Sequence, residues 1–283
     1  MLASLALLAQ ESSIRFERIQ PSTDFTCEGA TFADLDRDGK NDVIAGPWWY
    51  AGPDFKTKHA IYPAVAFDPH GYSDSFFAWP RDLDGDGWLD LLVVGFPGKE
   101  AFWYRNPLAD PAKRDAPWER FLVAASVDNE SPTYVDLTGD GAPELVFQFD
   151  GRFGYASPVA GDPNAAWTFH AIAEKSEIGR FTHGLGVGDI NGDGRKDVLW
   201  KEGWYEQPAS LKGDPVWTFH AYRFSEREGG AQMLVTDVDG DGDADVITSL
   251  AAHHFGLSWF EQVKKDREIT FVEHRLMDED PSK

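Results

Sequence analysis

The chain has 283 residues, of which 42% are hydrophobic and 14% aromatic, and this suffices to bury a large core in one domain or two. A formal net charge of -22 argues against nucleic acid and anionic membrane surfaces as partners, because both need a basic patch that neutralises phosphates. The one cysteine, Cys27, excludes an intramolecular disulfide and argues against a cysteine-rich structural zinc site, so we expect a buried thiol.

The first residues, MLASLALLAQE, have the apolar core and small-residue end of a secretory signal peptide, although the basic segment that normally precedes the core is missing. We interpret residues 1–10 as a signal-peptide-like segment; the alternative is an apolar N-terminus without a targeting role. The interpretation predicts a secreted or extracytoplasmic protein, in the periplasm or at the cell surface. No later apolar run is long enough to span a bilayer, so we expect no membrane span.

The rest of the chain repeats one acidic stretch of nine residues. The five copies are DLDRDGKND from Asp34, DLDGDGWLD from Asp82, DLTGDGAPE from Asp136, DINGDGRKD from Asp189 and DVDGDGDAD from Asp237. Their starts are 48, 54, 53 and 48 residues apart. A regular period of this length indicates one supersecondary unit per repeat.

Each acidic stretch lies between two short strand-like runs, such as FFAWP before the second copy and LLVVG after it. An aromatic run follows, as in WYAGP, WYRNP and WYEQP, and then a run that alternates like a strand, as in WTFHAI and WTFHAY. Four strands per period of about 50 residues are typical of a β-propeller blade. The sequence therefore predicts an all-β protein with a propeller domain over residues 14–278, first strands innermost, and a short tail at 279–283.

The run IRFERI at 14–19 resembles a fourth strand, yet all five repeats already have one. Propellers commonly close by letting one end of the chain complete the blade that the other end begins. We therefore expect a chain truncated at its C-terminal side, from a propeller of about six blades. Residues 14–19 should then lie at an open edge or pair with the last strand.

Carboxylates at alternate positions of a glycine-turned loop suit calcium, which takes about six to eight oxygen ligands. Positions 1, 3, 5 and 9 would supply side-chain oxygens and position 7 a carbonyl, such as that of Trp88. The predicted ligands are Asp34, Asp36, Asp38, Asp42, Asp82, Asp84, Asp86, Asp90, Asp136, Asp140, Glu144, Asp189, Asn191, Asp193, Asp197, Asp237, Asp239, Asp241 and Asp245.

Three alternatives to this calcium-loop interpretation exist: an EF-hand, a magnesium site and acidic turns without metal. An EF-hand needs a glutamate at position 12, where these loops have Ala45, Val93, Phe147, Trp200 and Thr248. Magnesium prefers to keep several waters, and acidic surface turns without metal remain the alternative. The third copy has Thr138 at position 3 and Glu144 at position 9, so we expect it to bind calcium most weakly or not at all.

With this motif the sequence resembles the FG-GAP/VCBS repeat family, whose integrin-α-like blades have D-x-[DN]-x-[DN]-G-x-x-D between their first two strands. The resemblance covers residues from about 14 to about 275. It implies a propeller with structural calcium in the loops and a range of functions: adhesion, lectin-like binding and a few enzymes. RFTHGLGVGDINGDGRKD and GWYEQP also resemble, more loosely, the propeller of aldos-2-ulose dehydratases, which act on oxidised sugars.

Strand direction sorts the histidines. If the acidic loops join strands 1 and 2 at one face, the links between strands 2 and 3 and between blades lie on the other, here called the top face. Four histidines recur in fourth strands (His59, His170, His220, His274), where blade packing is expected, and four map to top-face links (His70, His183, His253, His254). With Tyr72, Asp74, Arg180 and Glu202 in the same topology, the second group is a candidate site for a second metal or for acid–base chemistry; the alternative is histidines too far apart to meet.

Two functions follow. The first is an exported, calcium-binding propeller that binds a protein or a glycan on its top face. The alternative is a metal-dependent carbohydrate-active enzyme, of the lyase or dehydratase type, with a histidine-rich top-face site. Trp48, Trp79 and Trp88 do not recur from blade to blade and are weak candidates for ligand contacts. No nucleophile elbow, P-loop or dinucleotide-binding motif is present.

Overall fold

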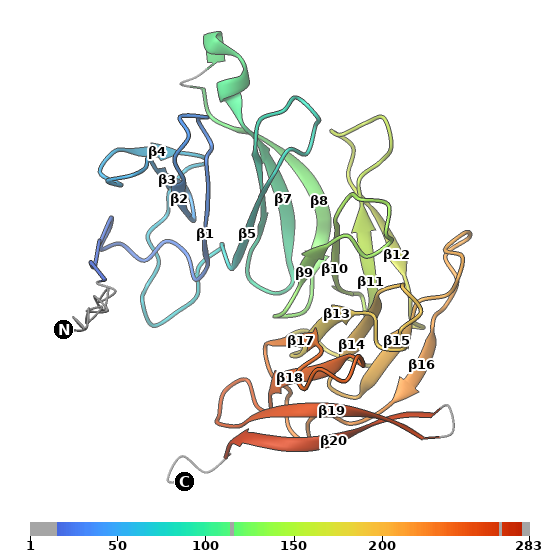
Figure 1. Ribbon diagram of the computed structural model, residues 1–283. Coiled ribbons are helices and arrows are strands. Elements are labelled where there is room, and N and C mark those ends of the chain that lie inside the picture. The colour runs from blue at the N-terminus through green and yellow to red at the C-terminus, as the bar shows by residue number, and fades with distance from the viewer. Residues whose placement is uncertain (1–15, 114–115, 266–267, 279–283) are drawn as a thin grey trace, which may run out of the picture.

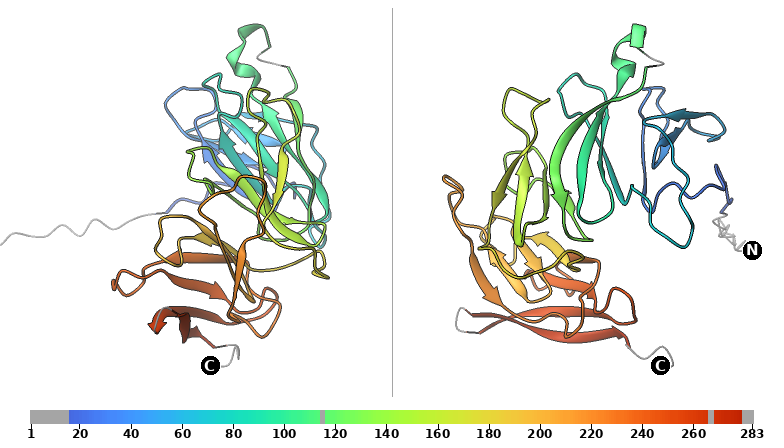
Figure 2. Two further views of the ribbon diagram at one scale, coloured as in Figure 1. Left: turned by 90° about the vertical axis from the view of Figure 1, so that its right-hand side faces the viewer. Right: turned by 180° about the vertical axis from the view of Figure 1, so that it is seen from behind.

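The computed structural model describes residues 16–113, 116–265 and 268–278. They form 20 strands and two short 3-10 helices, η1 (Pro107–Ala109) and η2 (Pro111–Lys113). The strands make five units of four antiparallel strands, and these follow one another in chain order along an arc (Figure 1). The view from behind shows the first and last units at the two ends of this arc (Figure 2). The prediction of an all-β protein built from propeller blades is confirmed.

Each unit, called blade 1 to blade 5 here, keeps its strands in sequence order. Blade by blade, the strands are β1 (Ala30–Ala33), β2 (Asp42–Ala45), β3 (Trp48–Tyr50) and β4 (Lys58–Ala60); β5 (Phe77–Arg81), β6 (Asp90–Val94), β7 (Lys99–Arg105) and β8 (Glu119–Val127); β9 (Thr133–Val135), β10 (Glu144–Phe149), β11 (Arg152–Ser157) and β12 (Thr168–Ala171); β13 (Leu185–Gly188), β14 (Asp197–Trp200), β15 (Gly203–Glu206) and β16 (Thr218–Ala221); β17 (Gln232–Thr236), β18 (Asp245–Ser249), β19 (Leu257–Lys265) and β20 (Glu268–Met277).

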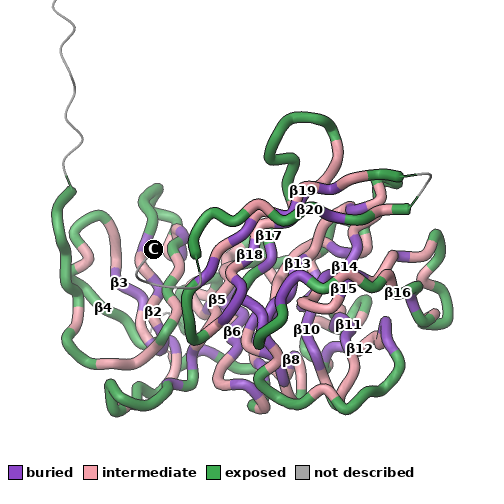
Figure 3. Tube along the Cα trace, turned by 90° about the horizontal axis from the view of Figure 1, so that it is seen from below, coloured by how far each residue is buried: buried purple, intermediate pink, exposed green. Residues whose placement is uncertain are grey.

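In the middle blades the second strand is buried on both faces, because a neighbouring blade packs on each side. β6, with the sequence DLLVV, is buried along its whole length, and β10, ELVFQF, is buried at all but its last residue. Nearly continuous apolar runs are typical of strands covered on two sides. The fourth strands are more exposed, and β4 is exposed throughout. Buried segments accordingly follow the inner strands, while the loops are exposed (Figure 3).

The first strands are innermost. β13 and β17 pair in parallel, with Leu185 opposite Gln232 and Gly186 opposite Met233, and this joins blades 4 and 5 into one eight-stranded sheet. The close approach needs glycine: a Cβ on Gly186 would lie 2.5 Å from the carbonyl oxygen of Met233, and one on Gly188 would lie 2.4 Å from Val235 Cβ. The sequence LGVG therefore places both glycines where two inner strands meet.

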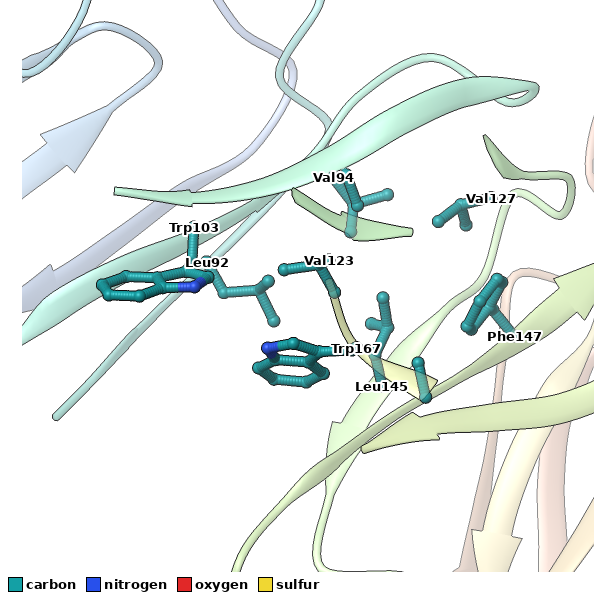
Figure 4. Close-up of a cluster of buried hydrophobic side chains, with 10 residues drawn as sticks. Leu92, Val94, Trp103, Val123, Val127, Leu145, Phe147 and Trp167 are labelled. Atoms are coloured by element: carbon teal, nitrogen blue, oxygen red, sulfur yellow. The ribbon is translucent and has the colours of Figure 1, made fainter. Parts of the chain in front are cut away.

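Four apolar clusters hold the arc together, one between each pair of consecutive blades. In the cluster between blades 2 and 3, Leu92, Trp103 and Val123 of blade 2 face Leu145 and Phe147 of blade 3 (Figure 4). All five are at most 1% exposed. No blade has a closed core of its own, so each blade is stabilised by its neighbours.

A stacked pair of rings links the third and fourth strands of every blade. The pairs are Trp49–His59, Trp103–Phe121, Tyr155–His170, Trp204–His220 and Trp259–His274, with ring centroids 4.1 to 4.9 Å apart. His220 and His274 also contact a carboxylate two residues after the tryptophan, in Glu206 and Glu261. The prediction that the fourth-strand histidines serve blade packing is confirmed.

The described part of the run 14–19 lies at the open end of the arc beside blade 1 (Figure 1), one of the two expected placements, but it forms no strand, and Phe16 is 93% exposed. One smaller prediction is wrong. Cys27 is half-buried rather than buried. The segment 1–10 and the tail 279–283 lie outside the described residues. Among the described residues, no helix is long and apolar enough to cross a membrane.

Candidate metal loops and top-face site

The first carboxylate of each acidic loop holds the turn. In the second loop, Asp82 Oδ1 accepts a hydrogen bond from the Gly85 N–H at 2.8 Å, and Asp82 Oδ2 accepts one from the Gly87 N–H at 2.9 Å. Asp136, Asp189 and Asp237 repeat this pattern. In the first loop, Asp34 accepts from the Asp38 and Gly39 N–H groups. The sixth residue is glycine in all five loops, with φ from +85° to +94°, a conformation that other residues adopt at a cost.

The ninth carboxylate has a different part. Asp90 opens β6 and is fully buried, and its two oxygens accept from two separate backbone groups: Oδ2 from the Leu83 N–H at 2.9 Å and Oδ1 from the Asn106 N–H at 2.8 Å. Asp42, Asp197 and Asp245 bridge the loop and the end of the third strand in the same way. This residue therefore clamps the blade, and only its remaining lone pairs are free to bind a metal.

Burial raises the pKa of these ninth carboxyl groups, and this effect is larger than the lowering caused by their hydrogen bonds. The pKa rises to about 7 in Asp90 and in Asp197, with backbone N–H groups as the opposing influence and neighbouring loop carboxylates adding to the rise. The pKa values of Asp42 and Glu144 are raised for the same reason. A bound cation would lower these pKa values again, because a positive charge favours the ionised carboxylate.

The carboxylate groups of three loops fit a calcium ion. Two oxygens bound to one calcium at about 2.4 Å can be no more than about 4.8 Å apart. Groups of three carboxylates meet this limit: Asp34, Asp36 and Asp42; Asp82, Asp84 and Asp86; Asp237, Asp239 and Asp245. The chemistry of the donors, all oxygen on flexible loops, suits calcium rather than a softer metal.

The other two loops lack such a trio of acidic groups among the described residues. In the fourth loop, Asn191 replaces one carboxylate, and its side-chain oxygen accepts from the Asp193 N–H at 3.0 Å. In the third, the Thr138 hydroxyl donates to Glu144 Oε1 at 3.1 Å, so that the ninth carboxylate is engaged within the loop. The weaker calcium binding expected of the third loop stays a prediction.

Contacts between loops of neighbouring blades were not foreseen from the sequence. The Asn106 side-chain amide donates to the carbonyls of Leu35 and Leu89, which lie in loops 1 and 2. Gln207 does the same for Leu137 and Lys196 in loops 3 and 4. Both amides stand directly before the proline that follows the third strand, in the endings RNP and EQP, and this shared position could have been noticed in the sequence.

The top face brings two of its four candidate histidines together. His183, in the link between β12 and β13, and His253, in the link between β18 and β19, have ring centroids 5.2 Å apart and nearly perpendicular rings. Glu130, in the link between β8 and β9, joins them: one ligand atom of each residue lies within 4.8 Å of the others. His183 is 7% exposed, whereas Glu130 is partly exposed and His253 exposed.

His70 and His254 are exposed and belong to no described group of metal-ligating side chains. Of the other candidates, Arg180 lines the same cavity as His183 and His253, while Asp74 lines a different one. Glu202 is paired with Lys201 and Arg223. The sequence prediction named Asp74 and Glu202 as top-face carboxylates but not Glu130, although the link between β8 and β9 lies on the same face.

A larger cavity, of about 630 Å³, lies between blades 1 and 2. Aromatic rings line it, with Tyr62 and Tyr104 stacked at 4.7 Å and Trp118 beside them, together with the charged side chains Asp74 and Arg120. Burial raises the pKa of both tyrosines, so their hydroxyls stay protonated over the physiological range. The cavity thus combines flat apolar surfaces with hydrogen-bonding groups.

The tryptophans proposed as ligand contacts are engaged within the fold. Trp48 lies under Lys58 Nζ, at 4.3 Å from the ring centroid, and Trp88 lies under the Arg37 guanidinium, at 4.7 Å. Trp79 stacks on Phe77 beside the core between blades 2 and 3. All three are half-buried.

Fold and loops together define a class: a β-propeller assembled from blades that each have an acidic, glycine-turned loop between the first two strands. A family model described as an FG-GAP-like repeat matches residues 82–147. Human integrin alpha-IIb is 27% identical over 154 residues, which are 45% of this chain and 15% of the integrin subunit. Residues 82–147 therefore match an FG-GAP-like repeat, and the predicted resemblance to that family is confirmed. The looser resemblance to aldos-2-ulose dehydratases stays a prediction.

A solved structure shares the architecture, and a second is similar at a lower TM-score. An Agrocybe aegerita lectin, described as recognising non-reducing terminal N-acetylglucosamine, has a TM-score of 0.50 at 19% identity, over 88% of this chain and 66% of the lectin. The V. cholerae biofilm matrix protein Bap1 has a TM-score of 0.48 at 15% identity, over 85% of this chain and 38% of Bap1. At these identities the likeness concerns the fold. The chain also spans only part of each of these proteins.

Proposed function

We propose that this chain is an exported, calcium-stabilised propeller that binds a glycan, with protein ligands as the second possibility. The observation that carries the proposal is the cavity between blades 1 and 2, where Tyr62, Tyr104 and Trp118 accompany Asp74 and Arg120. Aromatic rings pack on the apolar faces of sugar rings, while charged side chains bind the hydroxyl groups. The lectin-like fold agrees with this assignment.

Calcium has a structural part in the proposal. The acidic loops carry hydrogen bonds that fix the turn and the blade, and their carboxylates repel one another at a net charge of -22. A cation bound only by the native chain adds to stability by mass action. Export would supply the millimolar calcium that such extracellular modules use. Loops 1, 2 and 5 are the proposed principal sites.

A glycan array that includes glycans with terminal N-acetylglucosamine tests the binding assignment. Asp74→Ala and Arg120→Ala remove exposed side chains of the cavity and should abolish or strongly weaken the binding signal. Asp162→Ala and Lys212→Ala, exposed changes in blades 3 and 4, are the matched controls and should bind like the wild type. Array binding unaffected by both cavity variants would contradict the site, and no binding to any glycan would favour a protein ligand.

The enzyme alternative is favoured by a single observation, the approach of Glu130, His183 and His253 on the top face. Their donor set differs from that of the loops and is typical of metals that assist catalysis. Turnover of an oxidised sugar that depends on a transition metal, rather than on calcium, would support this function over the binding module.

A further inference from the structure

Three links from different blades converge at the top face and are fixed by backbone bridges. Asn129 and Thr182 form a parallel bridge, and the Glu130 N–H donates to the Thr182 carbonyl at 3.1 Å. A second bridge joins Gly229 to Ala251, two residues before His253. Glu130, His183 and His253 therefore project from segments held by main-chain hydrogen bonds. Such support favours a preformed group of side chains.

The distance between Glu130 and His183 is informative. His183 Nδ1 lies 3.4 Å from Glu130 Oε2, longer than a good N–H···O hydrogen bond. Two ligands of one tetrahedral zinc ion, at bonds of about 2.0–2.1 Å, lie about 3.4 Å apart. The pair is thus spaced as neighbouring ligands of a metal. His253 is exposed on a turn, and one of its ring nitrogens lies within 4.8 Å of a ligand atom of each of the other two residues.

The two residues that flank Glu130 in the chain are polar, and each has a buried atom without a hydrogen-bond partner in the part of the chain that the structure describes. Asn129 is 2% exposed and Ser131 is fully buried, yet Asn129 Nδ2 and Ser131 Oγ have no hydrogen-bond partner among the described residues. Buried polar groups are normally satisfied by protein, ordered water or a ligand.

The charges nearby do not oppose a cation. Arg180 and Lys201 line the same cavity, of about 340 Å³, but each is paired with a carboxylate: Arg180 with Asp128 at 3.5 Å and Lys201 with Glu202 at 2.6 Å. The chain as a whole is acidic. The cavity, which His183 and His253 line together with Glu228, also leaves room beside the two imidazoles for water or an added ligand.

We propose that Glu130, His183 and His253 bind a divalent transition metal of the zinc class, at a site separate from the calcium loops and open to this cavity. Two imidazoles and one carboxylate are ligands that zinc, iron, manganese and cobalt share, whereas calcium prefers oxygen alone. Three protein ligands leave positions for water or for an oxygen of an added molecule, as in catalytic rather than structural zinc sites.

Titration calorimetry with zinc chloride tests the proposal, using the whole chain with its loops saturated by calcium. One equivalent of zinc should bind, and both His253→Ala and Glu130→Gln should weaken it by at least about tenfold. His254→Ala, the adjacent exposed histidine, is the matched control and should bind zinc like the wild type. His253 is exposed, so its loss leaves the fold intact, as a melting curve would verify.

Cobalt gives a second measurement that excludes the acidic loops. Cobalt bound with imidazole nitrogen in four- or five-fold coordination absorbs far more strongly in the visible range than cobalt in an all-oxygen loop. The wild type and His254→Ala should show this absorption, and His253→Ala should lose it. Zinc binding that is unchanged in His253→Ala and Glu130→Gln, or that disappears on calcium saturation, would overturn the proposal.

Discussion

Replacing Asp90 by alanine should destabilise the protein whether or not calcium is present. The side chain is fully buried, and its removal leaves the N–H groups of Leu83 and Asn106 without an acceptor. Each buried, unsatisfied group costs about 1–3 kcal/mol, so the loss is roughly 2–6 kcal/mol. Against a typical total stability of about 5–15 kcal/mol, this is a large fraction.

Asp86→Ala is the matched variant in the same loop. Asp86 is exposed, and its Oδ1 accepts one local hydrogen bond from Trp88. Without calcium its replacement should change stability by no more than about 0.5 kcal/mol, as is usual for exposed sites. With calcium at about 100 times the dissociation constant, the variant should lose up to about 2.7 kcal/mol, the contribution of one bound ion.

Urea unfolding of the wild type and both variants, in excess chelator and in excess calcium, separates the two parts. If Asp90 clamps the blade, Asp90→Ala should lose stability in both conditions. If Asp86 is a calcium ligand, Asp86→Ala should lose stability only in calcium. A cost below about 1 kcal/mol for Asp90→Ala in chelator would refute the clamp. An Asp86→Ala variant that calcium stabilises as much as the wild type would refute its place as a ligand.

Three further outcomes are expected. Without calcium, urea midpoints should fall as the pH rises from about 4 to 7, since the folded carboxyl of Asp197, with a pKa of about 7, holds a proton that the unfolded chain releases near its ordinary value. Asp197→Asn should flatten this decline, and a steeper one would contradict the assignment. Gly186→Ala should cost about 1–3 kcal/mol in urea unfolding, because its Cβ would lie 2.5 Å from the Met233 carbonyl oxygen; Gly179→Ala, with open space around it, is the control, and equal losses would count against the close approach. His220→Ala should lower stability by about 1 kcal/mol through loss of its ring stack, whereas His220→Phe should keep most of it, and equal losses in thermal melts would argue against stacking.

The sequence alone determined most of the fold. The alternation of apolar residues and the period of the acidic loops depend on contacts close in the chain, and these are repeated five times. The sequence also predicted the direction of each strand, because antiparallel strands return the chain to the face that it left. This direction assigned His183 and His253 to links on the top face. Local spacing likewise selected the loop carboxylates, since a turn of nine residues brings its own side chains together.

Only the tertiary structure decided which distant groups meet. Glu130, His183 and His253 come from three links, and their separation depends on how blades 2 to 5 pack against one another. The clamp of Asp90 likewise involves Asn106, at the end of another strand. Repetition gives each blade its shape but not the angles between blades, because these are set by non-repeating side chains in the clusters between them. Sequence periodicity therefore predicts the blade and its loops, whereas the contacts across blades arise from packing that has no local signature.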